Sequence, residues 1–147
     1  MTIAPEFEER WNRLKGEGRP GLTEALSIQI TDLQRGSVKA TMPVTDSVKQ
    51  PFGLLHGGAS VALAETVASL GSVMLIDPDT EIAAGAEINA NHLIPVKSGS
   101  VHATATAVHL GRSLHVWEIR ITDDRDRLVC ISRCTVAVQT LPQSRER

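Results

Sequence analysis

Hydrophobic and polar residues alternate along six stretches of the chain, two before residue 45 and four after residue 80. A period of two is typical of a strand that buries one face, and Val38, Ala40 and Met42 mark that face in the second stretch. A short polar turn at residues 34–36 joins the first pair. The predicted strands are residues 25–33, 36–44, 81–93, 99–110, 113–122 and 127–139.

Two segments have helical patterns instead. Residues 5–15 form a short amphipathic helix with Phe7, Trp11 and Leu14 on one face. Residues 57–75 contain almost only Ala, Ser, Val, Leu and Gly, so this longer helix is apolar nearly all round and is predicted to be buried.

The order of these elements predicts an α+β fold, in which a curved antiparallel β-sheet wraps around the central 57–75 helix. We expect a single domain over residues 1–147, with its core at about 21–140 and residues 1–20 as an N-terminal helical extension. One sheet around one helix leaves a face or an edge uncovered. A second copy that continues the sheet would cover it, so a homo-oligomer is expected.

Composition excludes several classes of function. The 147 residues include 41% hydrophobic and 22% charged residues, and the formal net charge is −2. This balance gives no support for a nucleic-acid or membrane partner. No apolar run approaches the ~20 residues that a membrane span needs. The first 18 residues are charged throughout, unlike a secretory signal, so the cytoplasm is the predicted compartment.

Cys130 and Cys134 lie in one predicted strand, about 13 Å apart, which is too far for a disulfide. We expect reduced structural thiols. The spacing of His and carboxylate residues indicates no metal site, and the sequence contains no phosphate-binding or dinucleotide-binding motif. No cofactor is expected.

Glu65 is the exceptional residue of the long helix, because its neighbours are all apolar or small. A buried carboxylate costs several kcal/mol unless it is paired or changes its protonation. Two interpretations stay open. Glu65 acts in catalysis, or an arginine or backbone donors satisfy it and it holds the helix in place.

The start of the same helix offers a complementary group. Gly57 and Gly58 put small residues at the first turn, where free N–H groups and the positive end of the helix dipole point outward. They would allow an acyl carbonyl to approach the backbone, although they could also only shape the loop. Gly57 and Glu65 are ~12 Å apart along one helix. A site that uses both therefore requires two antiparallel helices from two subunits.

Three further polar residues flank these positions. Ser69 lies one helical turn after Glu65 and either orients a water molecule or permits close helix packing. Gln50 and His56 precede the helix and could donate hydrogen bonds to the carbonyl. The remaining histidines are scattered over predicted strands, and His102 is expected to be an ordinary strand residue.

Four segments together resemble the hotdog-fold acyl-CoA thioesterases, over about residues 21–139. They are QPFGLLHGGASVALAE, GAEINANHLIP, HLGRSLHVWEI and RLVCISRCTVAV. The most similar branch is the PaaI-like branch that acts on aryl-CoA esters such as 4-hydroxybenzoyl-CoA and 1,4-dihydroxy-2-naphthoyl-CoA. The resemblance implies a hotdog sheet, dimers that pair into tetramers, and hydrolysis of an acyl-CoA to the free acid and CoA.

The resemblance also implies roles for individual residues. Glu65 matches the catalytic carboxylate, either as nucleophile or as general base, and Ser69 matches a residue that assists the attack. Gly57 matches the amide that polarises the thioester carbonyl, supported by Gln50 and His56. The implied substrate and CoA contacts are Gly85, His92, Leu93, Ile94, Pro95, His109, Leu110, Gly111, Arg112, Ser113 and Leu114.

One departure from the branch concerns the phosphates of CoA. Ile94 stands where relatives carry arginine, so Arg112, Lys97 or Arg133 would have to supply the charge, and Arg112 is preferred. The predicted walls of the acyl pocket are Phe52, Leu54 and Met74. Two alternatives to a thioesterase are a hotdog dehydratase or hydratase and a non-catalytic acyl-CoA sensor.

Overall fold

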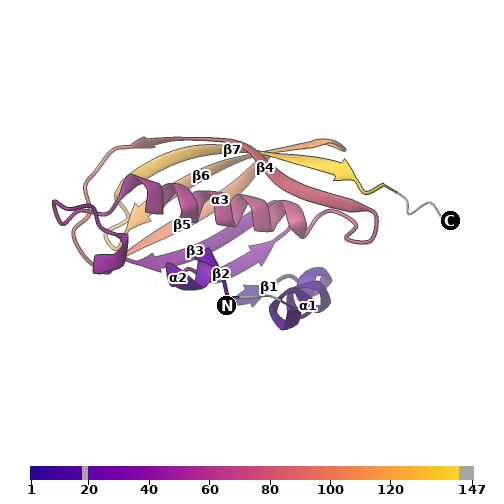
Figure 1. The fold of residues 1–147 in the computed structure, drawn as a ribbon, viewed down its shortest axis with the longest axis horizontal. Helices are drawn as coiled ribbons and strands as arrows, with labels where there is room; N and C mark the ends of the chain where they lie inside the picture. The colour runs from indigo at the N-terminus through magenta and orange to yellow at the C-terminus, as the bar shows by residue number, and fades with distance from the viewer. Residues whose placement is uncertain (18–19, 143–147) are drawn as a thin grey trace.

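A seven-stranded sheet forms the frame of the molecule (Figure 1). The computed structural model describes residues 1–17 and 20–142, and within them the strands lie in the order β1-β2-β3-β5-β6-β7-β4. Only the β1–β2 pair is parallel, and the other pairs are antiparallel. The strands are β1 (Thr2–Ile3), β2 (Gln29–Gln34), β3 (Ser37–Pro43), β4 (Glu81–His92), β5 (Ser100–Leu110), β6 (Leu114–Asp123) and β7 (Leu128–Thr140).

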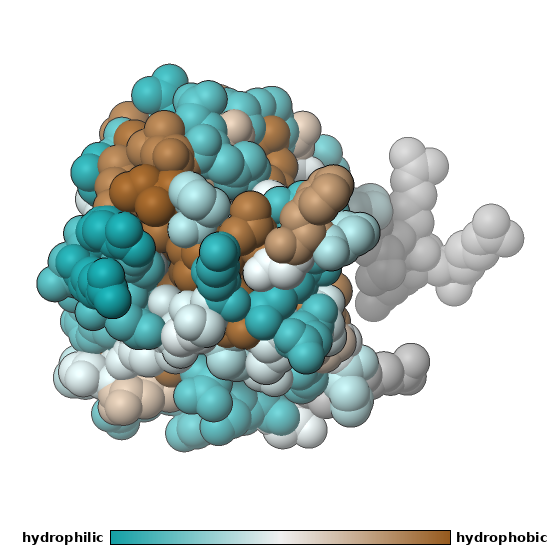
Figure 2. Space-filling view, turned by 90° about the vertical axis from the view of Figure 1, so that its left-hand side faces the viewer, coloured by the Kyte–Doolittle hydropathy of each residue, from teal (hydrophilic) through white to brown (hydrophobic). Residues whose placement is uncertain are grey.

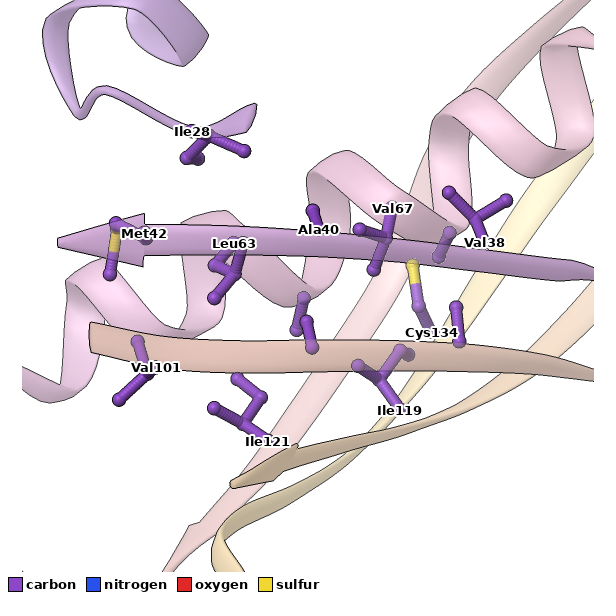
Figure 3. Close-up of a cluster of buried hydrophobic side chains, with 14 of the residues drawn as sticks. Ile28, Val38, Ala40, Met42, Leu63, Val67, Val101, Ile119, Ile121 and Cys134 are labelled. Carbon is purple, nitrogen blue, oxygen red and sulfur yellow. The ribbon is translucent and has the colours of Figure 1, made fainter. Parts of the chain in front are cut away.

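The long helix α3 (Gly57–Val73) lies across one face of this sheet (Figure 1). Its residues Leu63 and Val67 are fully buried against the strands. Figure 3 shows these side chains beside those of β3, where Val38 and Met42 alternate with less buried neighbours. The predicted α+β class, with the sheet wrapped around a central helix, is confirmed.

Small residues let α3 approach the sheet closely. The indole N–H of Trp117, a fully buried residue of β6, donates to the Ser72 hydroxyl at 2.8 Å. A Cβ on Gly71 would lie only 2.6 Å from Cη2 of the same ring. The largest side chain of the core therefore fits because α3 presents glycine and serine to it.

The N-terminal segment is partly as predicted. A 3-10 turn, η1 (Pro5–Phe7), leads into α1 (Glu8–Glu17), with Phe7 buried and Leu14 exposed at the opposite end of the predicted apolar face. The strand predicted from residue 25 starts only at Gln29, because residues Leu22–Ala25 form the helical turn α2. Glu24 stabilises that turn by accepting the Gly21 N–H at 2.8 Å. A second 3-10 turn is η2 (Asp46–Val48).

One side of α3 remains partly open, contrary to the prediction of a buried helix. The sheet can cover only one side, so the opposite side keeps half-buried residues: Val61, Ala62, Glu65, Thr66, Ser69 and Leu70. Beside it, β4 pairs only with β7 among the described strands, which leaves a 12-residue edge. Both features are what a second copy would cover.

The two cysteines are buried and free, as predicted. Burial raises the pKa of the Cys130 thiol, and burial together with the charge of Glu65 raises the pKa of Cys134 to about 11. Across residues 1–17 and 20–142, no helix combines the length and the apolar character needed to cross a membrane.

Candidate active site

In the first turn of α3, the backbone N–H of Gly57 is the donor without a hydrogen-bond acceptor among the described residues. His56 Nδ1 accepts the Gly58 N–H at 2.8 Å, and the His56 carbonyl accepts the Ala59 and Ser60 N–H groups at 3.0 and 3.3 Å. No acceptor within the described residues bonds the Gly57 N–H. A substrate oxygen placed there would receive this N–H and the positive end of the helix dipole.

The cap also fixes the tautomer of His56. Because Nδ1 accepts a hydrogen bond from the backbone, the neutral ring carries its proton on Nε2. The exposed ring therefore presents a second N–H donor beside the helix start. Gln50 belongs to the preceding turn, where its N–H donates to the Leu54 carbonyl at 2.8 Å and Gly53 adopts a φ of +78°.

A hollow of about 310 Å³ adjoins this helix start, and we call it the Gly57 hollow. Its lining residues are Gln50, Leu54, Leu55, Gly57, Ser60, His92, Leu93, Ile94, Pro95, Val96 and Val129. The structure thus brings together the implied residues Gln50, Gly57 and 92–95 from three segments of the chain. Figure 2 faces the end of the molecule where α3 begins and shows hydrophobic surface between hydrophilic patches.

The ring of His92 packs against Gly57. Its Nε2 is 2.8 Å from the position that a Cβ on Gly57 would occupy. The absence of a side chain on Gly57 leaves the space that this ring occupies. A side chain at this position would displace the ring and cover the free N–H.

Glu65 is held over the edge strand. Its Oε1 lies 2.5 Å from the position of a Cβ on Gly85, next to a register shift of β4 between Gly85 and Glu87. The side chain is half-buried, less than the sequence suggested, because the sheet covers only the opposite side of α3. No cation or hydrogen-bond donor of the described residues contacts its carboxylate. The purely structural interpretation of Glu65 therefore finds no partner within residues 1–17 and 20–142.

A second hollow of about 420 Å³ lies beside this carboxylate, and we call it the Glu65 hollow. Its lining residues are Leu22, Gly58, Val61, Ala62, Glu65, Thr66 and Ser69. The Thr66 hydroxyl donates to the Ala62 carbonyl at 2.7 Å, whereas no protein group in the described residues bonds the Ser69 hydroxyl. Sequence reasoning missed Leu22 and Thr66: it predicted no element at Leu22, which reaches the site through the helical turn α2, and it singled out only Glu65 and Ser69 on this part of α3.

The remaining implied contacts lie elsewhere in the single chain. Leu110, Gly111 and Arg112 line a hollow of about 300 Å³ near the other end of α3, beside Leu75 and Ile76, and His109, Ser113 and Leu114 are exposed on the same turn. The complete lining of this hollow is Arg35, Leu75, Ile76, Glu81, Leu110, Gly111, Arg112, His115 and Val138.

Several smaller predictions can be placed as well. Leu54 lines the Gly57 hollow as predicted, but Phe52 is exposed on its turn and Met74 belongs to the core. Lys97 and Arg133 are exposed and line none of the hollows described above. His102 pairs with Asp124 on the surface at 2.9 Å. Among residues 1–17 and 20–142, no three His, Cys, Asp or Glu side chains are grouped to hold a metal ion.

Comparisons with known proteins identify the family. Residues 52–130, which contain Gly57, Glu65 and Gly85, match the thioesterase superfamily. The chain belongs to this superfamily. It is 53% identical over 119 residues to the 1,4-dihydroxy-2-naphthoyl-CoA hydrolase of Listeria monocytogenes. The aligned region covers 81% of this chain and 96% of that protein.

Solved structures give the same result. A mutant of the Staphylococcus aureus thioesterase SAV0944 is 50% identical, covers 80% of this chain and 98% of its own, and superposes with a TM-score of 0.79. The Haemophilus influenzae thioesterase HI1161 is 41% identical, covers 94% of each chain and superposes with a TM-score of 0.81. The predicted hotdog thioesterase family is therefore confirmed, and the chain is a thioester hydrolase.

Proposed function

We propose that the protein hydrolyses acyl-CoA thioesters with an aromatic acyl group, releasing the free acid and CoA. The observation that carries the proposal is the Glu65 carboxylate, which Gly85 accommodates and which no cation among the described residues neutralises. A carboxylate without a partner beside an open hollow is available to attack a substrate or to activate water.

The helix start supplies the complementary charge. The free Gly57 N–H and the Nε2–H of His56 donate to the thioester carbonyl oxygen, with the Gln50 amide as a third donor. These donors stabilise the negative charge that develops on the oxygen as the carbonyl carbon becomes tetrahedral. No metal ion or organic cofactor is required for this polarisation.

Glu65 then acts in one of two ways. As a nucleophile, it forms a bond to the carbonyl carbon while the C–S bond breaks, and water hydrolyses the resulting mixed anhydride. As a general base, it takes a proton from water as the water oxygen attacks the same carbon. In both routes the sulfur leaves as the CoA thiolate and is protonated.

Two copies of the chain would share each site. Within one chain, Gly57 and Glu65 line separate hollows and are ~12 Å apart along α3. The open side of α3 and the free edge of β4 lie next to each other, so a second copy that pairs along β4 would cover both. An antiparallel arrangement then places Gly57 of one helix opposite Glu65 of the other.

The relatives support the substrate class and the residues. The Listeria relative is named for an aromatic acyl-CoA. The S. aureus thioesterase has been crystallised with a glutamine and, separately, a glutamate replaced by alanine; these two residues are 15 positions apart, the same separation as Gln50 and Glu65 here.

Free-thiol release from benzoyl-, hydroxybenzoyl-, naphthoyl- and hexanoyl-CoA tests the proposal. We expect turnover of the aryl esters and a fall of at least ~10³-fold in kcat for Glu65→Ala. Glu87→Gln, which removes an exposed carboxylate from β4, is the matched control and should keep its activity. Full turnover by Glu65→Ala would contradict the mechanism.

Other results would identify the two alternatives. Tight acyl-CoA binding without thiol release would indicate a non-catalytic sensor, and addition of water to the acyl chain with the thioester intact would indicate a hydratase. A single turnover in ¹⁸O-labelled water tests the nucleophilic role of Glu65. In the general-base route the label enters only the free acid, so label found on Glu65 would show that its carboxylate formed the anhydride and that water opened it at the Glu65 carbonyl carbon.

A further inference from the structure

A third hollow continues the Glu65 hollow along α3, and we call it the α1 groove. It measures about 500 Å³ and lies between α1, α2 and α3. Thr66 and Ser69 line both hollows, so the groove begins where the Glu65 hollow ends. Its lining residues are Trp11, Leu14, Lys15, Pro20, Thr23, Glu24, Ile30, Thr66, Ser69, Leu70 and Val73.

The two facing walls of the groove are formed mainly by apolar side chains. Leu70 and Val73 of α3 and Ile30 of β2 are half-buried on one side, and Trp11 and Leu14 of α1 lie on the other. Leu14 is 37% exposed. The ammonium group of Lys15 lies 5.9 Å from the centre of the Trp11 ring. Trp11 packs partly against the core, and the remaining apolar surface of Trp11 and Leu14 faces this groove.

The dimensions fit the acyl part of a thioester. Ser69 and Val73 lie one and two turns beyond Glu65, ~6 and ~12 Å along the helix axis. An acyl group whose carbonyl carbon is at Glu65 and which follows α3 would approach Ser69 with one ring and enter the groove beyond Ser69 with two fused rings. An acetyl group would end before the groove.

We propose that α1 forms the outer wall of the acyl-binding groove, and that Trp11 and Leu14 make the enzyme select acyl groups with a ring or several carbons over acetyl. This inference rests on the proposed function, because it takes Glu65 as the position of the reacting carbonyl. A flat indole face stabilises an aromatic acyl group by stacking and excludes water from it.

Substitutions on α1 test the inference through selectivity. We expect Trp11→Ala and Leu14→Ala to lower kcat/KM for naphthoyl- and benzoyl-CoA by about tenfold or more relative to acetyl-CoA, since an acetyl group does not reach them. Asn12→Ala changes an exposed residue of the same helix that lines none of the hollows described above, and it should leave the ratio unchanged. Equal losses for every acyl group, or no loss, would overturn the inference.

Fluorescence provides a readout that needs no turnover. Trp117 is fully buried, so the half-buried Trp11 is the tryptophan that a ligand in the groove can contact. Phenacyl-CoA is a thioether and cannot be hydrolysed. We expect it to change the tryptophan emission more than CoA alone, and Trp11→Phe to abolish the difference without unfolding the protein.

The outcomes for the two proposals are distinguishable. If no thioester is hydrolysed but phenacyl-CoA changes the Trp11 emission, the proposed function is wrong and the groove still binds acyl groups. If phenacyl-CoA binds by calorimetry with no change in Trp11 emission, the inference about α1 is wrong and the proposed function stands. Absence of binding would overturn the inference as well.

Discussion

The carboxylate of Glu65 occupies the space that a side chain on Gly85 would fill, with Oε1 2.5 Å from the position of its Cβ. The two residues are 20 positions apart in sequence and belong to α3 and the edge strand β4. Gly85 is thus explained by the carboxylate above it, and the register shift that follows it in β4 is part of the same arrangement.

Gly85→Ala should reduce turnover without unfolding the protein. The added methyl forces the carboxylate out of position, and misplacement of a reacting group by about 1 Å is worth ~10²-fold in rate. Steady-state kinetics and a thermal melt of the same sample measure the two effects. Gly16→Ala adds a methyl where nothing lies within 4 Å and serves as the control. Native kcat in Gly85→Ala would show that the close approach has no functional role.

Complementation tests whether two subunits share a site. Glu65→Ala and His56→Ala are each expected to be inactive as homodimers. If the helix start of one subunit works with Glu65 of the other, each mixed dimer keeps one intact site, so a 1:1 co-expression should recover about a quarter of the native activity. Recovery no greater than the sum of the two variants would place the whole site within one chain.

The two roles of His56 can be separated by substitution. His56→Ala removes the acceptor for the Gly58 N–H and should cost about 1 kcal/mol of folding free energy as well as activity. His56→Ser restores a cap acceptor but has no donor at the position of Nε2. We expect its stability to return while kcat remains low, as measured by urea unfolding and thiol release. Recovery of both would reduce His56 to a helix cap.

The close approach of Gly71 to the Trp117 ring should prevent the core from accepting a side chain at position 71. A methyl on Gly71 would meet the indole ring at 2.6 Å and Val38 at 3.1 Å. Neither neighbour is at the end of a flexible chain, so Gly71→Ala should destabilise the fold by about 1–3 kcal/mol through overpacking. Urea unfolding measures this loss. An unchanged midpoint would mean that the ring shifts at no cost.

The buried thiols predict an alkaline loss of stability. The pKa of Cys134 rises from 9.0 to about 11, so below pH 9 the thiol is protonated in both states. Between pH 9 and 11 the unfolded chain releases the proton while the folded chain retains it, and stability falls as pH rises. Urea unfolding from pH 8 to 11 should show this slope, and Cys134→Ala should reduce it. The chain contains no tyrosine that would titrate in the same range.

The same burial predicts low reactivity of the thiols. At pH 8 the folded protein should react with a thiol reagent many times more slowly than the urea-unfolded chain, which exposes both Cys130 and Cys134. Equal rates would mean that this part of the sheet opens readily.

The sequence by itself determined the local structure and the chemistry. Alternation in β3 fixed which face is buried, because strand side chains alternate regardless of what they contact. Glu65 was conspicuous because a carboxylate among small apolar residues needs an explanation. The paired glycines located the helix start. The helical turn at residues 22–25 was not predicted, and the strand was started at residue 25 instead of Gln29; the turn is stabilised by the Glu24 carboxylate, which accepts the Gly21 N–H.

Tertiary structure decided which of these residues meet. The strand order β5-β6-β7-β4 carries β4 to the edge, and this places Gly85 under Glu65 and His92 beside Gly57. It also leaves 109–114 at the far end of α3 in the single chain, although the resemblance grouped that turn with residues 92–95. Periodicity reports only the environment of each residue along its own element. Contacts between elements depend on packing over the whole sheet, which no local pattern contains.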